Sequence, residues 1–334
     1  MLPLIVVIVI LFLSIMMIWK GSDWVTDSLI PVAQKLGTSY IAVTTLLVSF
    51  TLSLPEIFSA VYSYLLGHQD IGLGVIVGSV IINIGLTVGI CAAIKPIKVD
   101  KGIVIRDGIY LITIAVIVMV FGSDLTYTRS EGAVLLLLFI PYILNVWYME
   151  KARSIKNREL RIEELKVNLK LIGEQGSFWK IKPSMKAFVL GEIFLVVGSY
   201  YFAQSLVDLS GFLHWSDMLI GVVIGAIGTE VPNVVAALQG TLKGYQDVAI
   251  TETFGSNIFT LLVTLGIFIM LGPFSIPPKI FYFDLVWMIA IHVLTLAFII
   301  KGYKYREESI TRLEGVILVL FYVCLLVINT FAFS

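Results

Sequence analysis

The sequence has little charge and no excess of either sign. Only 14% of its 334 residues are charged, whereas 58% are hydrophobic, and the 23 basic residues balance the 23 acidic ones. Soluble domains have about 25% charged residues, so this composition excludes a soluble globular enzyme and a disordered chain. A net charge of zero also provides no basic face that could bind a nucleic acid partner.

Cysteine and histidine are scarce as well. Both cysteines, Cys91 and Cys324, lie inside apolar runs, where we expect small inert side chains and neither a disulfide framework nor a zinc site. The three histidines, His68, His214 and His292, are scattered along the chain. We therefore expect no metal role for any of them.

Long hydrophobic runs are what the sequence has in abundance. A helix needs about 20 mostly apolar residues to cross a membrane. Ten stretches qualify, at about 2–19, 39–66, 71–94, 104–121, 132–149, 187–207, 217–242, 247–272, 283–300 and 313–333. The first run lacks a basic leader and a small-residue cleavage site, so it is predicted to be a helix and not a signal peptide.

The basic residues in the loops predict how the chain is oriented in the membrane. Twenty-one of them lie in alternate loops, and the loops on the opposite side contain only Arg129 and Lys279. Because basic residues concentrate in cytoplasmic loops, both termini are predicted to lie outside and the long polar segment 150–186 in the cytoplasm. Within it, residues 154–173 have helical amphipathic spacing, which suits a simple connector or a regulatory element.

The chain also contains an internal repeat. When the sequence is shifted by 177 residues, identical residues align without a gap from position 21 to position 107. Chance matches between apolar helices involve Leu, Ile and Val, but these include Gly, Pro, Ser, Asp and Gln. The aligned pairs include Gly21 with Gly198, Pro55 with Pro232, Asp70 with Asp247, Gly78 with Gly255, and Asp107 with Asp284.

The repeat predicts the fold. Each half has five spans, and since five is odd, the second half enters the membrane from the opposite side. We expect an all-α integral membrane protein with ten transmembrane helices in two inverted-topology five-helix repeats, 1–149 and 187–334, joined by the connector 150–186. Many secondary transporters have this architecture, with the substrate site near the midplane where broken helices meet.

Polar residues near the middle of spans two and seven are the first candidates for such a site. The two segments read Thr51-Leu52-Ser53-Leu54-Pro55-Glu56 and Gly228-Thr229-Glu230-Val231-Pro232-Asn233. A proline inside a span frees backbone carbonyls, which could bind an ion or simply kink the helix. A carboxylate there is costly, so Glu56 and Glu230 are functional candidates. In the repeat, Glu230 aligns with Ser53 and Asn233 with Glu56.

Spans three and eight supply the remaining candidates. Span three contains Ser79 and Asn83, and span eight contains Glu252, Ser256 and Thr260 at four-residue spacing on one helical face. Such a stripe could merely hold two helices together, but an unpaired carboxylate would do so poorly. All of these donors are hard oxygens, which favour Na⁺, Ca²⁺ or a similar cation over a soft metal.

With these residues, the sequence resembles the sodium/calcium exchanger family of the cation/calcium antiporter superfamily. That family has ten helices in two inverted repeats, each with a motif G-T-S-x-P-E followed by G-N-x-x-G-S-N. Matching positions in the first repeat are Ser53, Pro55, Glu56, Gly78, Ser79 and Asn83, and in the second Gly228, Thr229, Pro232, Gly255, Ser256 and Asn257. The resemblance covers nearly the whole chain.

The second repeat departs from the family motif at four positions. Asn233 replaces a glutamate that the resemblance would make a calcium ligand, and Thr260 stands where exchangers have an acidic residue. Glu230 replaces the motif serine, and Glu252 replaces the asparagine of Gly-Asn. The number of carboxylates is thus kept while their positions shift, so the resemblance implies the fold and transport class and leaves the ion and stoichiometry open.

These residues predict an antiporter that exchanges Na⁺ for Ca²⁺ by alternating access, with no enzymatic activity and no cofactor. Glu56 would be the shared ligand and Glu230 the second carboxylate. The predicted site also includes Ser53, Ser79, Asn83, Thr229, Asn233, Glu252, Ser256 and Thr260. Spans one and six, with little polar content, would slide past the core.

Three alternatives stay open. A buried carboxylate can take up a proton, so H⁺ could replace Na⁺ in exchange for Ca²⁺ or Mg²⁺. A non-transporting regulatory protein on the same scaffold and a passive channel are the others. We expect small cations and the lipid bilayer of a cell (inner) membrane as partners, with no nucleic acid and no obligatory protein partner.

Overall fold

The computed structural model describes residues 3–35, 50, 53–98, 101–152, 181–242, 246–304 and 309–332. Within this part of the chain, nine helices are long and apolar enough to cross a membrane. The expected span at 39–66 is described only in part, by helix α3 at Leu54–Leu65. Most of the predicted connector, residues 153–180, lies outside the described residues.

The first half of the chain consists of α-helices, a π-helix between α4 and α5, and a 3₁₀ turn after α6. They are α1 (Leu4–Lys35), α3 (Leu54–Leu65), α4 (Gln69–Ile82), the π-helix η1 (Asn83–Val88), α5 (Gly89–Ile94), α6 (Lys101–Phe121), the 3₁₀ turn η2 (Gly122–Asp124) and α7 (Arg129–Ala152). Helices α4, η1 and α5 form one continuous span.

The second half repeats this order. Its helices are α9 (Met185–Leu213), α10 (Asp217–Ile220), the π-helix η3 (Gly221–Gly225), α11 (Ala226–Leu242), α12 (Gln246–Phe259), the π-helix η4 (Thr260–Thr264), α13 (Leu265–Leu271), the π-helix η5 (Ile280–Asp284), α14 (Leu285–Lys304) and α15 (Arg312–Ala332). The π-helices η1 and η4 begin at Asn83 and Thr260, which the repeat places at equivalent positions.

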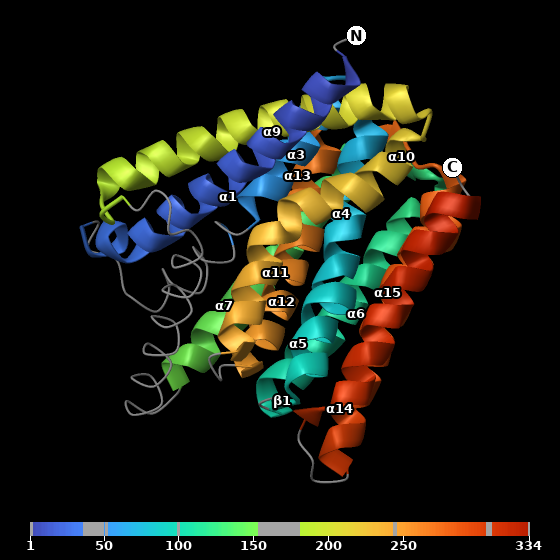
Figure 1. Cartoon of the computed structure of the whole chain (residues 1–334). Coiled ribbons are helices and arrows are strands. Elements are labelled where there is room, and N and C mark those ends of the chain that lie inside the picture. Colours follow the sequence, from blue (N-terminus) through green and yellow to red (C-terminus); the bar gives the residue numbers. More distant parts are fainter. Residues whose placement is uncertain are drawn as a thin grey trace.

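Two short antiparallel ladders join the two halves of the chain. Strand β1 (Ile97–Lys98) pairs with β4 (Ser309–Ile310), and β2 (Thr126–Tyr127) pairs with β3 (Phe274–Ser275). The repeat offset places β1 on β3. Each of these equivalent strands pairs with a strand from the other half of the chain. The N- and C-terminal ends of the chain lie at one end of the molecule, and β1 lies at the other (Figure 1).

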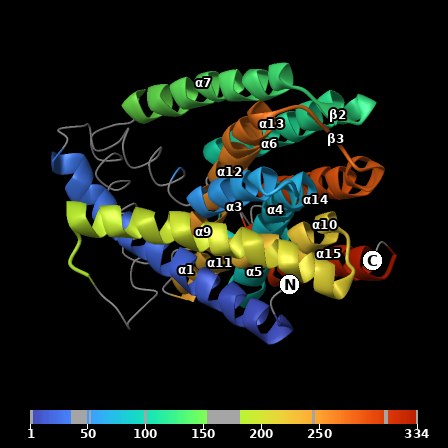
Figure 2. The same cartoon turned by 90° about the horizontal axis from the view of Figure 1, so that it is seen from above.

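Helices α1 and α9 lie side by side and cross the bundle obliquely (Figures 1 and 2). A Cβ on Gly21 would lie 2.7 Å from the Gly191 carbonyl oxygen, and a Cβ on Gly198 would lie 3.2 Å from that of Ser14. These are equivalent contacts in the repeat, and small residues are what allow membrane helices to approach so closely. Contrary to the expectation of little polar content, α1 also buries Asp23.

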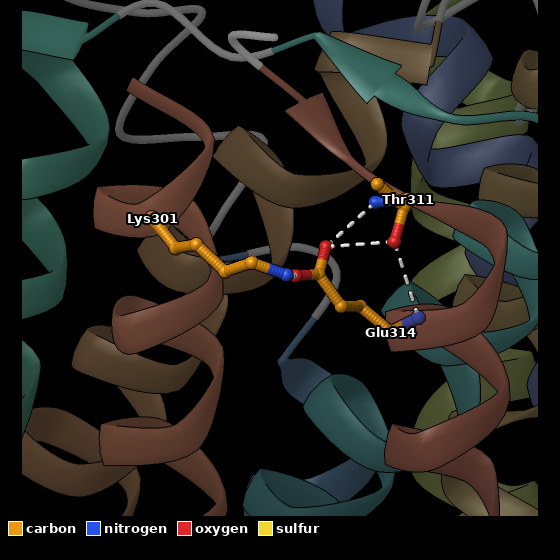
Figure 3. A network of polar contacts seen from close by, with 3 residues as sticks. All are labelled: Lys301, Thr311 and Glu314. Carbon is orange, nitrogen blue, oxygen red and sulfur yellow. Dashed lines mark hydrogen bonds and ion pairs between the residues drawn. The ribbon is translucent and has the colours of Figure 1, made fainter. Parts of the chain in front are cut away.

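Helices α7 and α15 each begin with a hydrogen bond between a threonine and the glutamate three residues later. In Figure 3, the Thr311 backbone N–H donates to Glu314 Oε2 at 2.9 Å, and the Glu314 N–H donates to Thr311 Oγ1 at 3.3 Å, which forms a capping box at the start of α15. Lys301 at the end of α14 donates to Glu314 Oε1 at 3.0 Å. At the start of α7, the Thr128 N–H donates to Glu131 Oε2 at 2.6 Å.

The two mid-span prolines do not have the same effect on their helices. Pro55 lies in the first turn of α3, where it needs no backbone donor. Pro232 lies inside α11, and the helix continues through it to Leu242. The two equivalent prolines therefore lie at different places in their helices, one in a first turn and one in a helix interior.

Candidate functional site

The candidate site lies where the span α4–η1 crosses η3 and the start of α11. A Cβ on Gly74 would lie 3.0 Å from the Gly221 Cα, and a Cβ on Gly78 would lie 3.0 Å from the Val222 carbonyl oxygen. The two backbones are thus in direct contact. This close crossing brings the polar residues of span three to those of span seven.

The carboxyl groups of Glu56 and Glu230 are neighbours at this crossing. Each residue is only 1% exposed, and the two carboxyl groups lie close enough to interact electrostatically. Neither Glu56 oxygen has a hydrogen-bond donor among the described residues. Two acids buried this close together cannot both stay ionised unless a positive charge or a shared proton compensates them.

Glu230 is held on both of its oxygens. Asn83 Nδ2 donates to Oε1 at 3.1 Å, and Asn233 Nδ2 donates to Oε2 at 2.8 Å. Since both oxygens accept, this geometry suits the ionised carboxylate. The two amides leave their own carbonyl oxygens out of these bonds, so both remain suitable as ligands for a cation.

Hydroxyl groups complete this part of the site. Ser79 Oγ and Thr229 Oγ1 are 3.3 Å apart, and Thr229 also donates toward the backbone carbonyls of Gly225 and Ala226 at 3.2 Å. Ser53 is 1% exposed, and its hydroxyl has no partner among the described residues. Among the ten predicted residues, hydrogen bonds join Asn83 and Asn233 to Glu230 and Ser79 to Thr229. Glu56 lies beside Glu230, and Ser53 is the N-cap residue of the helix that carries Glu56.

The other three predicted residues come from span eight. Ser256 is 6% exposed and Thr260 is 1% exposed at the start of η4, but no hydrogen bond between described side chains joins them to the carboxylate pair. The Glu252 side chain lies outside the described residues. Among the residues described, no group of three or more acidic, histidine or cysteine side chains could hold a metal ion.

Sequence reasoning did not include Asn257 and His292 in the site. Asn83 Nδ2 donates to Asn257 Oδ1 at 3.0 Å, and Asn257 Nδ2 lies 3.1 Å from His292 Nε2. Asn257 could have been found from the Gly255-Ser256-Asn257 match with the family motif. His292 had no such signal, because a single histidine in an apolar helix resembles any other buried residue.

Comparisons with known proteins cover both halves of the chain. Residues 6–148 and 184–331 each match the family described as sodium/calcium exchanger protein. The matches fall on the two halves that the internal repeat defines. They leave out the segment 149–183 between them.

Individual relatives extend over nearly the whole chain. The chain is 28% identical to the sodium/calcium exchanger MaX1 of Methanosarcina acetivorans, over 96% of this chain and 97% of the relative. It is 29% identical to the putative antiporter CaxA of Alkalimonas amylolytica, over 92% and 93%. Among solved structures, the sodium-calcium exchanger NCX_Mj soaked with Na⁺ and Sr²⁺ has a TM-score of 0.62 at 24% identity, over 97% of this chain and 98% of that chain, and so shares the fold.

Proposed function

The chain belongs to the sodium/calcium exchanger protein family, and from this premise we propose that it exchanges Na⁺ for Ca²⁺ at a site built around Glu56 and Glu230. It is a multi-pass membrane protein of a family of ion exchangers, whose ligands are transported ions. The ion pair and the site residues are our proposal. The single observation that supports it best is the pair of buried carboxyl groups, with both Glu56 oxygens free of donors among the described residues.

The chemistry of this pair fits a divalent cation. Ca²⁺ takes six to eight oxygen ligands at about 2.3–2.6 Å, and two carboxylates balance its charge. Neutral oxygens from Asn83, Asn233 and the hydroxyls of Ser53, Ser79 and Thr229 are available to complete the shell. Ser256, Thr260 and Glu252 would contribute from span eight in the same proposal.

Exchange follows because the ligands are shared. One set of carboxylates cannot hold Ca²⁺ and Na⁺ together, since like charges repel and the number of oxygens is limited. Each ion then leaves before the other binds. Helices α1 and α9 would slide over the crossing of α4 and α11 to open the site to alternate sides of the membrane.

The decisive test measures Na⁺-driven ⁴⁵Ca²⁺ uptake in proteoliposomes. We expect Glu56→Gln and Glu230→Gln each to abolish uptake, because each removes one of the two charges that balance Ca²⁺. The matched control is Glu192→Gln on α9, which removes a partly exposed carboxylate that is not among the predicted site residues. Unchanged uptake in both acid variants would remove this assignment.

Proton coupling is the second candidate, and the same carboxylate pair favours it. Two neighbouring acids can bind a divalent cation when ionised and protons when it leaves. In this case Ca²⁺ or Mg²⁺ uptake would follow an imposed pH gradient with no Na⁺ present. A flux independent of any counter-ion would instead indicate a channel, and saturable binding without flux a regulatory protein.

A further inference from the structure

A chain of hydrogen bonds leads from helix α14 to the Glu230 carboxylate. His292 Nδ1 lies 2.6 Å from the Met288 carbonyl oxygen, and its Nε2 lies 3.1 Å from Asn257 Nδ2. Asn257 Oδ1 accepts from Asn83 Nδ2 at 3.0 Å, and Asn83 Nδ2 donates to Glu230 Oε1 at 3.1 Å. All of these residues are at most 2% exposed, so water does not compete for their bonds.

The direction of every bond in this chain is determined by its two ends. The Met288 carbonyl can only accept, so Nδ1 of His292 carries a proton, and Nε2 accepts because its partner Asn257 Nδ2 can only donate. Asn257 Nδ2 donates to the Val80 carbonyl oxygen at 3.0 Å, which leaves its second hydrogen for His292 Nε2. Asn257 therefore presents its oxygen to Asn83.

The same reasoning fixes Asn83. Its amide nitrogen has two hydrogens, and these are used by Asn257 Oδ1 and Glu230 Oε1. Asn83 can then face a cation only through Oδ1. A reversed amide would turn a donor toward the cation and an acceptor toward the carboxylate, and both contacts would be repulsive.

This support belongs to one repeat only. Asn257 contacts Val80, which is its own equivalent in the 177-residue repeat, so the bond crosses the axis that relates the two halves. The position equivalent to His292 is Ala115, which offers no acceptor. The series of hydrogen bonds from His292 therefore reaches Glu230, whereas the Glu56 oxygens have no donor among the described residues.

We propose that His292 is a positioning residue for the ion site: its neutral ring, protonated on Nδ1, fixes the amide direction of Asn257 and Asn83 and so keeps the Asn83 oxygen available to the cation. The inference rests on the proposed function for its transport consequence. Its structural part, the ring tautomer, stands without transport. Groups that orient metal ligands typically affect metal affinity 10–100-fold when they are removed.

The tautomer is tested on the full-length protein in detergent, labelled with ¹⁵N-histidine. The chain has three histidines, so the His292 signals are those that disappear in His292→Leu. We expect a neutral ring with its proton on Nδ1. A proton on Nε2 would overturn the proposal, because Asn257 Nδ2 would then meet a second donor.

The transport consequence is tested by the Ca²⁺ dependence of uptake in proteoliposomes. We expect His292→Leu to raise the half-saturating Ca²⁺ concentration by roughly 10-fold, with a smaller effect on the maximal rate. His292→Gln should restore it, since a glutamine oxygen can accept from Asn257. The control is Thr295→Val on the same buried face of α14, where, among the described residues, the hydroxyl bonds within its own helix to Ile291 O at 2.8 Å.

The outcomes separate this inference from the proposed function. If the wild-type protein does not take up Ca²⁺, the proposed function fails while the ring tautomer still tests the chain of bonds. If the wild type transports and His292→Leu has an unchanged Ca²⁺ dependence, the positioning role fails. Equal impairment in His292→Gln, His292→Leu and Thr295→Val would also overturn it, because packing alone would then explain the effect.

Discussion

Glu56 and Glu230 are neighbours in the structure, yet they are not equivalent positions of the repeat. Glu56 aligns with Asn233, and Glu230 aligns with Ser53. The two carboxyl groups meet across the crossing of the repeats, and Asn233 Nδ2 donates to Glu230 Oε2 at 2.8 Å. In span seven the carboxylate is at position 230 and not at position 233, about one helical turn earlier on the same helical face.

This relationship predicts that a glutamate at position 233 can replace the one at position 230. Glu230→Ser alone should abolish Na⁺-driven Ca²⁺ uptake, because it leaves Glu56 as the only carboxylate of the pair. Adding Asn233→Glu restores the second charge on the same face, so the double variant should recover a measurable share of wild-type ⁴⁵Ca²⁺ uptake. If the double variant stays as inactive as Glu230→Ser, position 233 does not face the site.

Much of the fold could be predicted from the sequence because its signals are local or periodic. Hydrophobic runs mark the spans, and the match of Gly, Pro and Asp residues at one offset marks the repeat. The sequence also places Ser79, Asn83 and Glu230 in one candidate site, but it does not predict the particular contact of spans three and seven. Orientation in the membrane and the role of the segment 150–186 stay predictions.

Other features depend on contacts that no sequence spacing encodes. Asn257 and His292 lie on different helices, and nothing in either helix alone indicates that their side chains meet. Pro55 and Pro232 are equivalent in the repeat, but Pro55 lies in the first turn of α3 and Pro232 lies inside α11, a difference that the two matching prolines do not predict. The ladders β1–β4 and β2–β3 are only two residues long, below what strand patterns can detect.

The close crossing at Gly221 should be sensitive to a single methyl group. A Cβ there would lie 2.4 Å from the Ile71 carbonyl oxygen, and backbone atoms cannot move aside cheaply. We expect Gly221→Ala to destabilise the protein by about 1–3 kcal/mol, measured as a lower midpoint of thermal unfolding in detergent. The control is Gly67→Asn, at a loop residue with φ of 87° where a side chain meets nothing within 4 Å. Equal stability of the Gly221→Ala protein would contradict the crossing.

The capping box in Figure 3 should stabilise the hairpin of α14 and α15. Thr311→Ala removes the hydroxyl that accepts from the Glu314 N–H at 3.3 Å and that donates to Glu314 Oε2 at 2.9 Å. The expected loss is about 1 kcal/mol of unfolding free energy. Thr330→Val near the other end of α15 loses a bond within its own helix, to Leu326 O, and should change the unfolding midpoint less. A larger effect at Thr330 would show that the cap does not matter.

The predicted orientation can be read from single cysteines. In a background where Cys91→Ala and Cys324→Ser remove the native thiols, Asp124→Cys and Ser154→Cys place one thiol on each predicted side. Because basic residues are retained in the cytoplasm, the segment with Ser154 should face inward and the loop with Asp124 outward. A membrane-impermeant maleimide should then label Asp124→Cys in intact cells and Ser154→Cys only after permeabilisation. The reverse pattern would invert the whole topology and place both termini in the cytoplasm.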